Sequence, residues 1–244
     1  MTNVTYVSCL YKLNACDDNN VTKMNENIHH LLQSGLRIIL FTDDHYYSQL
    51  KLLGDTVTVI VKPLQDLTIY RIIMEKEDIK MPTQRHPQKD SRDYMALMNC
   101  KPEFMLLAEP HIVTPYAGWL DCGIGKIFTN KQDVFDKLKT YKVNHLSQIL
   151  IPGCYDMSDQ MNFDQLMDMI FWSYCGGYCI MPLNLIKTFY NACLQQIQHC
   201  LDKQSIFWEV HTFILVHQAN PSLFFKYYGD HNDSIINIPS YFLN

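Results

Sequence analysis

A single carboxylate stands where a short apolar run ends, in residues 118–124 (GWLDCGI), whose fourth member is Asp121. In an open α/β sheet, ligands gather beyond the carboxyl ends of the strands. A carboxylate at such an end can hold a hard divalent cation, and the cation can neutralise a diphosphate. The alternative is an Asp that caps a turn, because Asp is a frequent turn residue and Gly123 follows it closely.

Two further groups have the chemistry to act beside Asp121. Glu209 lies within an apolar run, residues 207–210 (FWEV). Because an unpaired buried carboxylate is costly, we expect Glu209 to face a cleft, a cation or a hydroxyl-rich ligand. His231 lies in a polar string, residues 229–233 (GDHND), where neutral imidazole can bind a metal and imidazolium can bind an anion. The alternatives are a Glu209 on a solvated helix face and an ordinary Asx turn around His231.

A glycine pair, Gly176-Gly177, stands between Cys175 and Cys179. Glycine permits positive φ and a close approach to the backbone, which is useful where a sugar lies against the main chain. The alternative is a plain tight turn. The Cys-x₃-Cys spacing is a weak zinc signal, since no second Cys/His pair at finger spacing accompanies it.

The elements that must position these groups follow from the spacing of apolar residues. Three runs that are apolar or β-branched predict strands, at residues 4–10, 37–41 and 57–61. A helix between the first two is expected to begin at a Thr22 N-cap and to end at Gly35. Its buried face would hold Met24, Ile28, Leu31 and Leu32. Strands separated by helices imply βαβ units with right-handed crossovers.

The rest of the chain gives a less regular pattern. A short strand is expected to lead through Trp119 and Leu120 into Asp121. Helical spacing predicts helices around residues 94–98, from Pro102, at 185–201 and at 206–217. Residues 66–89 show no clear helical or strand periodicity, and within them residues 81–87 are expected to form an exposed loop. The charged run 89–93 indicates the solvated start of a helix. No repeat or linker marks a boundary, so we expect one α/β, Rossmann-like domain over residues 1–244, with a mostly parallel central sheet flanked by helices.

Composition excludes several classes of protein. Lys and Arg total 20 against 25 Asp and Glu, a net charge of −5, which argues against unspecific nucleic-acid binding. The nine cysteines are scattered, mostly in apolar runs, so we expect free thiols in a reducing compartment. The first residues lack a signal-peptide pattern and no apolar run approaches the ~20 residues of a membrane helix, so we expect a soluble, cytoplasmic protein without a membrane span. The richness in Asn, Ile and Tyr is typical of an AT-rich genome, such as a viral one.

Three absent motifs narrow the chemistry further. The sequence has no Gly-x-x-x-x-Gly-Lys phosphate loop, no Gly-x-Gly-x-x-Gly and no Gly-x-Ser-x-Gly. Dinucleotide oxidoreductases, P-loop ATPases and serine hydrolases are therefore disfavoured.

Taken together, four strings resemble the HtrL/YibB-like protein family, over residues 85–240. In that family a lysine-bearing helix precedes a Trp-Ile-Asp-Ala-Gly-Ile type of strand end. The matching strings are Lys89-Asp90-Ser91-x-x-Tyr94-x-x-Leu97-Met98-Asn99-x-Lys101, residues 118–124, Trp208-Glu209-Val210 and residues 228–235 (YGDHNDSI). The amino-terminal strands fit the family in pattern rather than in motif.

The resemblance implies a GT-A-like fold and a nucleotide-sugar ligand. In GT-A enzymes an Asp-x-Asp binds the ribose and a divalent metal, often manganese, and a later His or Asp completes the coordination. Asp121 matches the first Asp and His231 the later ligand, so we expect Mn, or Mg in its place. Position 123 is Gly, so the second carboxylate of the motif is missing.

The resemblance and the expected topology together assign the remaining site residues. By the resemblance, Glu209 matches the acidic position that would orient the acceptor or act as base, so Glu209 and Asp121 are the expected catalytic residues. The expected donor-binding residues near the sugar are Gly176, Gly177 and Trp208. In a transferase, Arg92 or Lys101 would assist at the diphosphate. The expected topology alone places Ser8, Leu10, Tyr11 and Asp43 near the base.

The resulting hypothesis is a glycosyltransferase. Its donor would be a nucleotide sugar, a UDP-sugar in the first place, and its acceptor a glycan, a protein or a small molecule. The missing second Asp motivates an alternative, a non-catalytic nucleotide- or sugar-binding module on the same fold. A nucleotidyltransferase is a third option, separated from the first by consumption of a nucleoside triphosphate.

Overall fold

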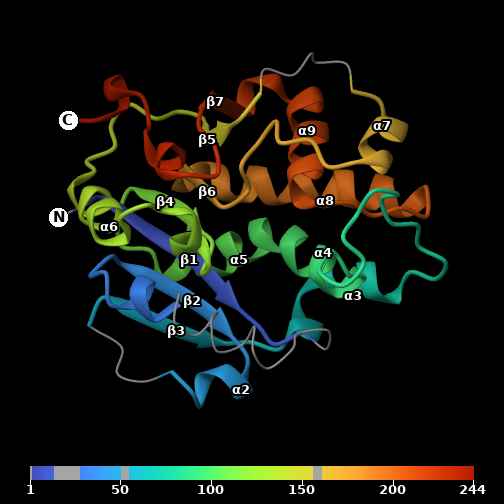
Figure 1. Ribbon diagram of the computed structural model, residues 1–244, viewed down its shortest axis with the longest axis horizontal. Helices are drawn as coiled ribbons and strands as arrows, with labels where there is room; N and C mark the ends of the chain where they lie inside the picture. Colours follow the sequence, from blue (N-terminus) through green and yellow to red (C-terminus); the bar gives the residue numbers. More distant parts are fainter. Residues whose placement is uncertain (1, 14–27, 51–54, 156–160) are drawn as a thin grey trace.

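The computed structural model describes residues 2–13, 28–50, 55–155 and 161–244, and these residues form a seven-stranded sheet (Figure 1). The strands are β1 (Val4–Leu10), β2 (Ile38–Thr42), β3 (Val57–Val61), β4 (Tyr116–Leu120), β5 (Ile149–Gly153), β6 (Tyr178–Pro182) and β7 (Phe224–Tyr228). Their order is β3-β2-β1-β4-β6-β5-β7. Strand β6 runs antiparallel to both its neighbours, and the other pairs are parallel.

Helices cover both faces of the sheet. One core packs the sheet against α3 (Thr68–Glu75), α4 (Arg92–Asn99), α5 (Lys101–Ala108), α7 (Phe163–Asp168), α8 (Ile186–Asp202) and α9 (Glu209–Ala219). The other core packs it against helical residues 28–32, α2 (Asp44–Tyr47) and α6 (Lys131–Thr140). Short 3₁₀ turns complete the chain: η1 (Leu64–Asp66), η2 (Glu109–His111), η3 (Ile124–Ile127), η4 (Leu183–Leu185), η5 (Pro221–Leu223), η6 (Asp233–Ile236) and η7 (Ser240–Phe242).

Strand β1 shows why the sheet is buried on both sides. All seven of its residues are buried. Successive side chains of a strand point to opposite faces, so Val7 and Cys9 enter one core while Tyr6 and Leu10 enter the other. This is the pattern of a parallel strand covered by helices on both faces. The predicted α/β class, with a mostly parallel sheet flanked by helices, is confirmed.

Several predicted elements occur where the sequence indicated them. The strands at 4–10 and 57–61 match β1 and β3, and the strand predicted at 37–41 occurs one residue later. Gly35 has a φ of +77° beyond the described end of the first helix, as a helix-terminating glycine should. The Thr22 cap and Met24 lie outside the described residues.

Other elements differ from the prediction. Helix α3 lies in the stretch predicted as irregular, and it buries Ile69, Tyr70 and Ile73. The helix predicted from Ile206 begins only at Glu209, because the preceding residues are extended and Ser205 pairs with Lys80. Glu209 is therefore in the first turn of α9 and not in a helix interior.

The strand order reverses beside β1. The chain runs from β1 outward to β2 and β3, and then returns to place β4 on the other side of β1. In open α/β sheets, ligands bind beyond the carboxyl ends of the strands at such a switch point. The end of β1 and Asp121, directly after β4, border this position. Within the described residues, no helix has both the length and the apolar character that crossing a bilayer requires.

Candidate active site

A cavity of about 700 Å³ opens at the switch point. Its wall includes Leu10 and Tyr11 at the end of β1, Asp121 after β4, Gly177 before β6, and Glu209 at the start of α9. Small-molecule sites commonly have volumes of roughly 300–1,000 Å³. The cavity is therefore large enough for a nucleotide-sized ligand.

Lys101 lies buried behind the cavity wall and contacts both acidic groups of the wall, Asp121 and Glu209. Its Nζ donates to Glu209 Oε1 at 2.7 Å and to the Gly176 carbonyl at 2.8 Å, and it lies 3.0 Å from Asp121 Oδ1. Trp119 Nε1 donates to the same Asp121 oxygen at 2.6 Å. Lys101 is only 2% exposed, so a single buried cation holds both carboxylates in place.

The electrostatics of this group favour the charged lysine. Burial by itself lowers the pKa of Lys101, but the carboxylates of Asp121 and Glu209 raise it above its ordinary value. The ammonium also lies 5.5 Å from the centre of the Trp119 ring, a favourable cation–π distance. With two carboxylates and one ammonium, the group carries a formal charge of −1.

Local structure explains how these side chains meet. The Asp121 amide donates to the Gly177 carbonyl at 3.0 Å, which ties the end of β4 to the loop before β6. Glu209 is in the first turn of α9, where the helix dipole stabilises an anion. A Cβ on Gly176 would lie 2.4 Å from Glu209 Oε1, so a larger residue there would displace the carboxylate that Lys101 contacts. The close approach at Gly176 is made by the Glu209 side chain, and the approach of a sugar stays a prediction. Positive φ is not involved, since among the described glycines only Gly35 has it.

Cationic and titratable groups also line the cavity. The exposed groups of this kind in the cavity wall are Lys89, Lys126, His86 and His231. The predicted exposed loop at 81–87 is irregular, and it contributes His86 to this wall. These groups could bind the phosphates of an anionic ligand. Aromatic surface is supplied by Tyr94, Trp172 and Trp208.

Ser8 and Asp43, which were predicted to contact the base, do not line the cavity. Ser8 is 0% exposed inside β1, and it is absent from the cavity wall. Asp43 instead caps α2: Oδ1 accepts from the Tyr46 amide at 2.8 Å and Oδ2 from the Lys12 amide at 3.2 Å. Leu10 and Tyr11, predicted with them, do line the cavity.

The two predicted diphosphate contacts are also corrected. Arg92 donates to the carbonyls of Ile73 and Lys76 at the end of α3, so it caps that helix and does not line the cavity. Lys101 is buried behind the wall, where it positions the carboxylates and has no surface for a donor. The predicted donor-binding residues that do line the cavity are Leu10, Tyr11, Gly176, Gly177 and Trp208.

The two predicted metal ligands each have other partners. Asp121 Oδ1 accepts from an ammonium and an indole, and Lys101 lies where a cation would approach that oxygen. The Nδ1 atom of His231 is near Cys154 and Asp230. Among the described residues, the ligand cluster that contains His231 does not include Asp121. Within the part of the chain that the structure describes, Asp121 and His231 therefore do not form a ready-made manganese site by themselves.

The sequence analysis missed His86, Lys126 and Trp172 as cavity residues. Lys126 lies in the turn that follows Asp121, so its position in the same loop was a usable signal. His86 and Trp172 lie in loops without a periodic pattern, and Trp172 is held by contacts with residues far along the chain, Cys154 and His231.

Comparison with known proteins adds little to this description. No protein-family model matches the chain, and no curated protein matches it. Among matching solved structures is the bifunctional IspDF from Campylobacter jejuni, at 9% sequence identity and a TM-score of 0.42. The match covers 93% of this chain and 50% of that chain, so this chain spans half of its length. At this level the match carries no argument about a ligand or an activity, and the HtrL/YibB-like resemblance stays a prediction from its motifs.

Proposed function

We propose that the protein is a glycosyltransferase that moves a sugar from a nucleotide-diphosphate donor, a UDP-sugar in the first place, to an acceptor hydroxyl. The observation that carries the proposal is the mixed polarity of the cavity at the switch point. It combines the carboxylates of Asp121 and Glu209 with the cations of Lys89 and Lys126. Carboxylates accept hydrogen bonds from sugar hydroxyls, whereas ammonium groups bind diphosphate oxygens.

The proposed roles follow from the contacts. Lys101 fixes Asp121 and Glu209 before a ligand arrives, so no reorganisation is needed during the reaction. Asp121 would hold hydroxyls of the donor. Glu209 would take the proton of the acceptor hydroxyl as its oxygen bonds to the anomeric carbon. The bond from that carbon to the diphosphate breaks, and the nucleoside diphosphate leaves as an anion beside Lys89 and Lys126.

The test is turnover of defined donors. UDP-, GDP- and ADP-sugars are supplied with simple glycan acceptors, and released nucleoside diphosphate is measured with Mn²⁺ and with a chelator. We expect release from at least one donor, and a loss of about 10²–10⁴-fold in kcat for Glu209→Gln with donor affinity retained. Glu109→Gln, at an exposed glutamate, is the matched control and keeps wild-type kcat.

Two results of this assay would contradict the proposed glycosyl transfer. If no donor is turned over and calorimetry detects no nucleoside diphosphate binding, the proposal is wrong. Consumption of a nucleoside triphosphate, with release of pyrophosphate, would indicate a nucleotidyltransferase instead.

One observation favours a second candidate, the non-catalytic binding module. The residue two places after Asp121 is Gly123, and open space surrounds the position where its Cβ would lie. A second carboxylate would fit at position 123, but the chain has glycine there. This candidate predicts donor binding without turnover, and no effect of Mn²⁺ on affinity.

A further inference from the structure

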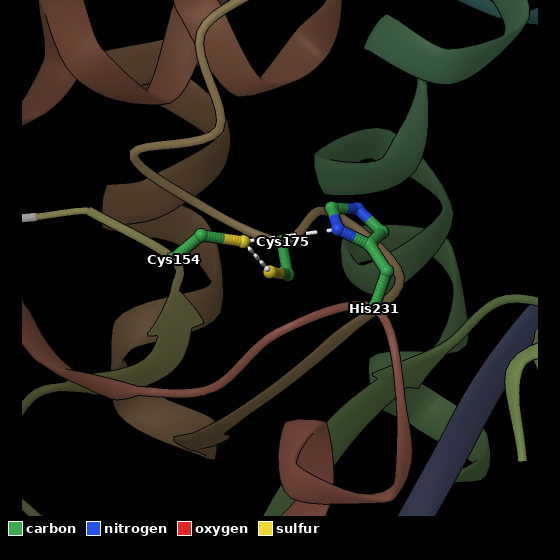
Figure 2. A group of neighbouring side chains, drawn as sticks. All are labelled: Cys154, Cys175 and His231. Atoms are coloured by element: carbon green, nitrogen blue, oxygen red, sulfur yellow. Dashed lines mark hydrogen bonds between the residues drawn. The ribbon is translucent and has the colours of Figure 1, made fainter.

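A second group of reactive side chains lies beside the cavity, formed by Cys154, Cys175 and His231 (Figure 2). Figure 2 shows the three side chains converging from three separate chain segments. One potential ligand atom of each lies within 4.8 Å of the others. The two sulfurs are 3.4 Å apart, and Cys154 Sγ is 3.7 Å from His231 Nδ1.

Main-chain hydrogen bonds hold these segments together. Cys154 follows β5 directly, and its amide donates to the Trp172 carbonyl at 3.1 Å. The Cys175 amide donates to the Pro152 carbonyl at 2.8 Å, and the Gly229 amide donates to the Gly153 carbonyl at 3.2 Å, next to His231. The three ligand atoms thus project from the carboxyl ends of β5 and β7 and from the segment that enters β6.

Close packing at Gly153 supports the same geometry. A Cβ on Gly153 would lie 1.9 Å from the Ser173 carbonyl oxygen, so any other residue would push the Cys154 and Cys175 segments apart. The His231 ring packs edge-on against Trp172, with ring centres 4.4 Å apart. The backbones and the imidazole therefore have defined positions before any ion arrives.

The observed spacings agree with a tetrahedral metal centre. Zinc–sulfur and zinc–nitrogen bonds of about 2.3 and 2.0–2.1 Å give tetrahedral edges of roughly 3.8 Å between sulfurs and 3.5 Å between sulfur and nitrogen. The corresponding distances here are 3.4 and 3.7 Å. Small side-chain rotations would complete the fit.

We propose that Cys154, Cys175 and His231 bind a zinc ion, with a fourth coordination position left for water or a ligand oxygen. Two thiolates and an imidazole are the ligands of zinc and other soft metals, whereas Mg²⁺ and Mn²⁺ prefer oxygen. Each thiol loses a proton on coordination, so the two thiolates balance the charge of the ion. Because His231 also lines the cavity, the fourth position is near bound ligand.

The zinc proposal does not rest on the proposed glycosyl transfer. The site uses none of Asp121, Lys101 and Glu209, and its presence is read from bound metal and not from turnover. The cluster pairs Cys175 with Cys154, 21 residues earlier, and Cys179 lies outside it.

The experiment uses the full chain, reduced and stripped with a chelator, and then titrated with Zn²⁺ or Co²⁺. We expect one zinc per chain by elemental analysis, and a cobalt spectrum with a thiolate charge-transfer band and the strong visible bands of tetrahedral Co²⁺. Cys154→Ser and His231→Gln each weaken zinc binding at least about tenfold. Zinc also raises the Tm of the wild type more than that of either variant.

Cys122→Ser is the matched control, because Cys122 is a half-buried cysteine of the cavity wall outside the cluster. It retains wild-type zinc affinity. The proposal is overturned by a wild type that binds no zinc, by equal affinity in Cys154→Ser and wild type, or by a cobalt spectrum without thiolate bands. A Cys154–Cys175 disulfide that forms equally fast with and without zinc also contradicts it. His231→Gln replaces an exposed residue, so the test remains decisive if a cysteine variant fails to fold.

Discussion

Lys101 places an ammonium group in the protein interior, within hydrogen-bond distance of one carboxylate and 3.0 Å from a second. The carboxylates of Asp121 and Glu209 stabilise the charged ammonium in this buried position. Loss of the cation would leave two acidic groups, one of them well buried, without their shared partner. At the scale of residues, the site is held together by this charge balance.

Lys101→Met should therefore lower the free energy of unfolding by about 3–5 kcal/mol, because breaking a buried ion pair leaves an uncompensated charge. Urea denaturation measures the loss. Lys142→Met, at an exposed lysine, is the control and should change stability by no more than about 0.5 kcal/mol. Adding Glu209→Gln to Lys101→Met should cost less than the sum of the two single changes, and strict additivity would contradict the shared-partner explanation.

Three glycines of the cavity make a graded series. An added Cβ meets Glu209 Oε1 at 2.4 Å from Gly176, meets Asp121 Oδ2 at 3.3 Å from Gly177, and meets nothing within 4 Å from Gly123. Gly176→Ala should cost about 1–3 kcal/mol through overpacking, Gly177→Ala less, and Gly123→Ala within about 0.5 kcal/mol of zero. Chemical denaturation gives the order, and a Gly123→Ala variant as unstable as Gly176→Ala would disprove it.

At the scale of elements, α9 both begins with Glu209 and supports the segment that carries Trp172. His211 on α9 makes the connection. Its Nε2 accepts from the Phe171 amide at 2.9 Å, and its Nδ1 lies 3.0 Å from the Leu166 carbonyl, so a neutral ring with hydrogen on Nδ1 satisfies both. Burial lowers the pKa of His211 to about 4, although the Leu166 hydrogen bond opposes the shift.

The depressed pKa predicts acid sensitivity. Between the ordinary pKa of 6.5 and about 4, the unfolded chain binds a proton at His211 that the folded chain does not, so stability falls as the pH falls. From pH 7 to pH 5 this group alone should remove about 2 kcal/mol. Urea midpoints at the two pH values measure it, and His211→Gln should flatten the difference whereas the exposed His111→Gln should not.

At the scale of the whole molecule, the cavity lies beyond the ends of β1 and β4, where the strand order reverses. The chain supplies its wall from the ends of β1 and β4, the loop before β6 and the start of α9. Ligand binding should therefore stabilise elements that are far apart in sequence. A single bound nucleotide is expected to raise the melting temperature of the whole fold.

UDP at 100 times its Kd should add about 2.7 kcal/mol of stability, a Tm increase of about 5–10 °C for a chain of this size. Gly123→Asp supplies a second carboxylate in open space, so its UDP-induced increase should depend on Mn²⁺ more strongly than that of the wild type. Differential scanning fluorimetry with Mn²⁺ and with a chelator compares the two. Equal metal dependence in both proteins would show that a carboxylate at position 123 does not bind the cation.

The sequence by itself determined the elements whose signals are local. Runs of apolar or β-branched residues predicted β1, β2 and β3, and the polar residue after the run 118–120 placed Asp121 at a strand end. The predictions of β1 and β2 succeed because all their residues are buried, and burial on both faces is visible within one short segment. Strand β3 lies at the edge of the sheet and has no buried residue, so its β-branched residues alone indicated it. Strands β5, β6 and β7 are short apolar runs of the kind that periodicity alone does not distinguish from buried helix, and they were not predicted.

Only the tertiary structure decided which side chains share a site. Lys101 meets a glutamate 108 residues later, and Cys154 meets an imidazole 77 residues later. Each residue type was visible in the sequence, but the partner depends on strand order and on main-chain contacts across the sheet. Arg92 and Ser8 were misassigned for the same reason: a residue's chemistry is local, whereas its burial and its partners are set by the packing of segments far apart along the chain.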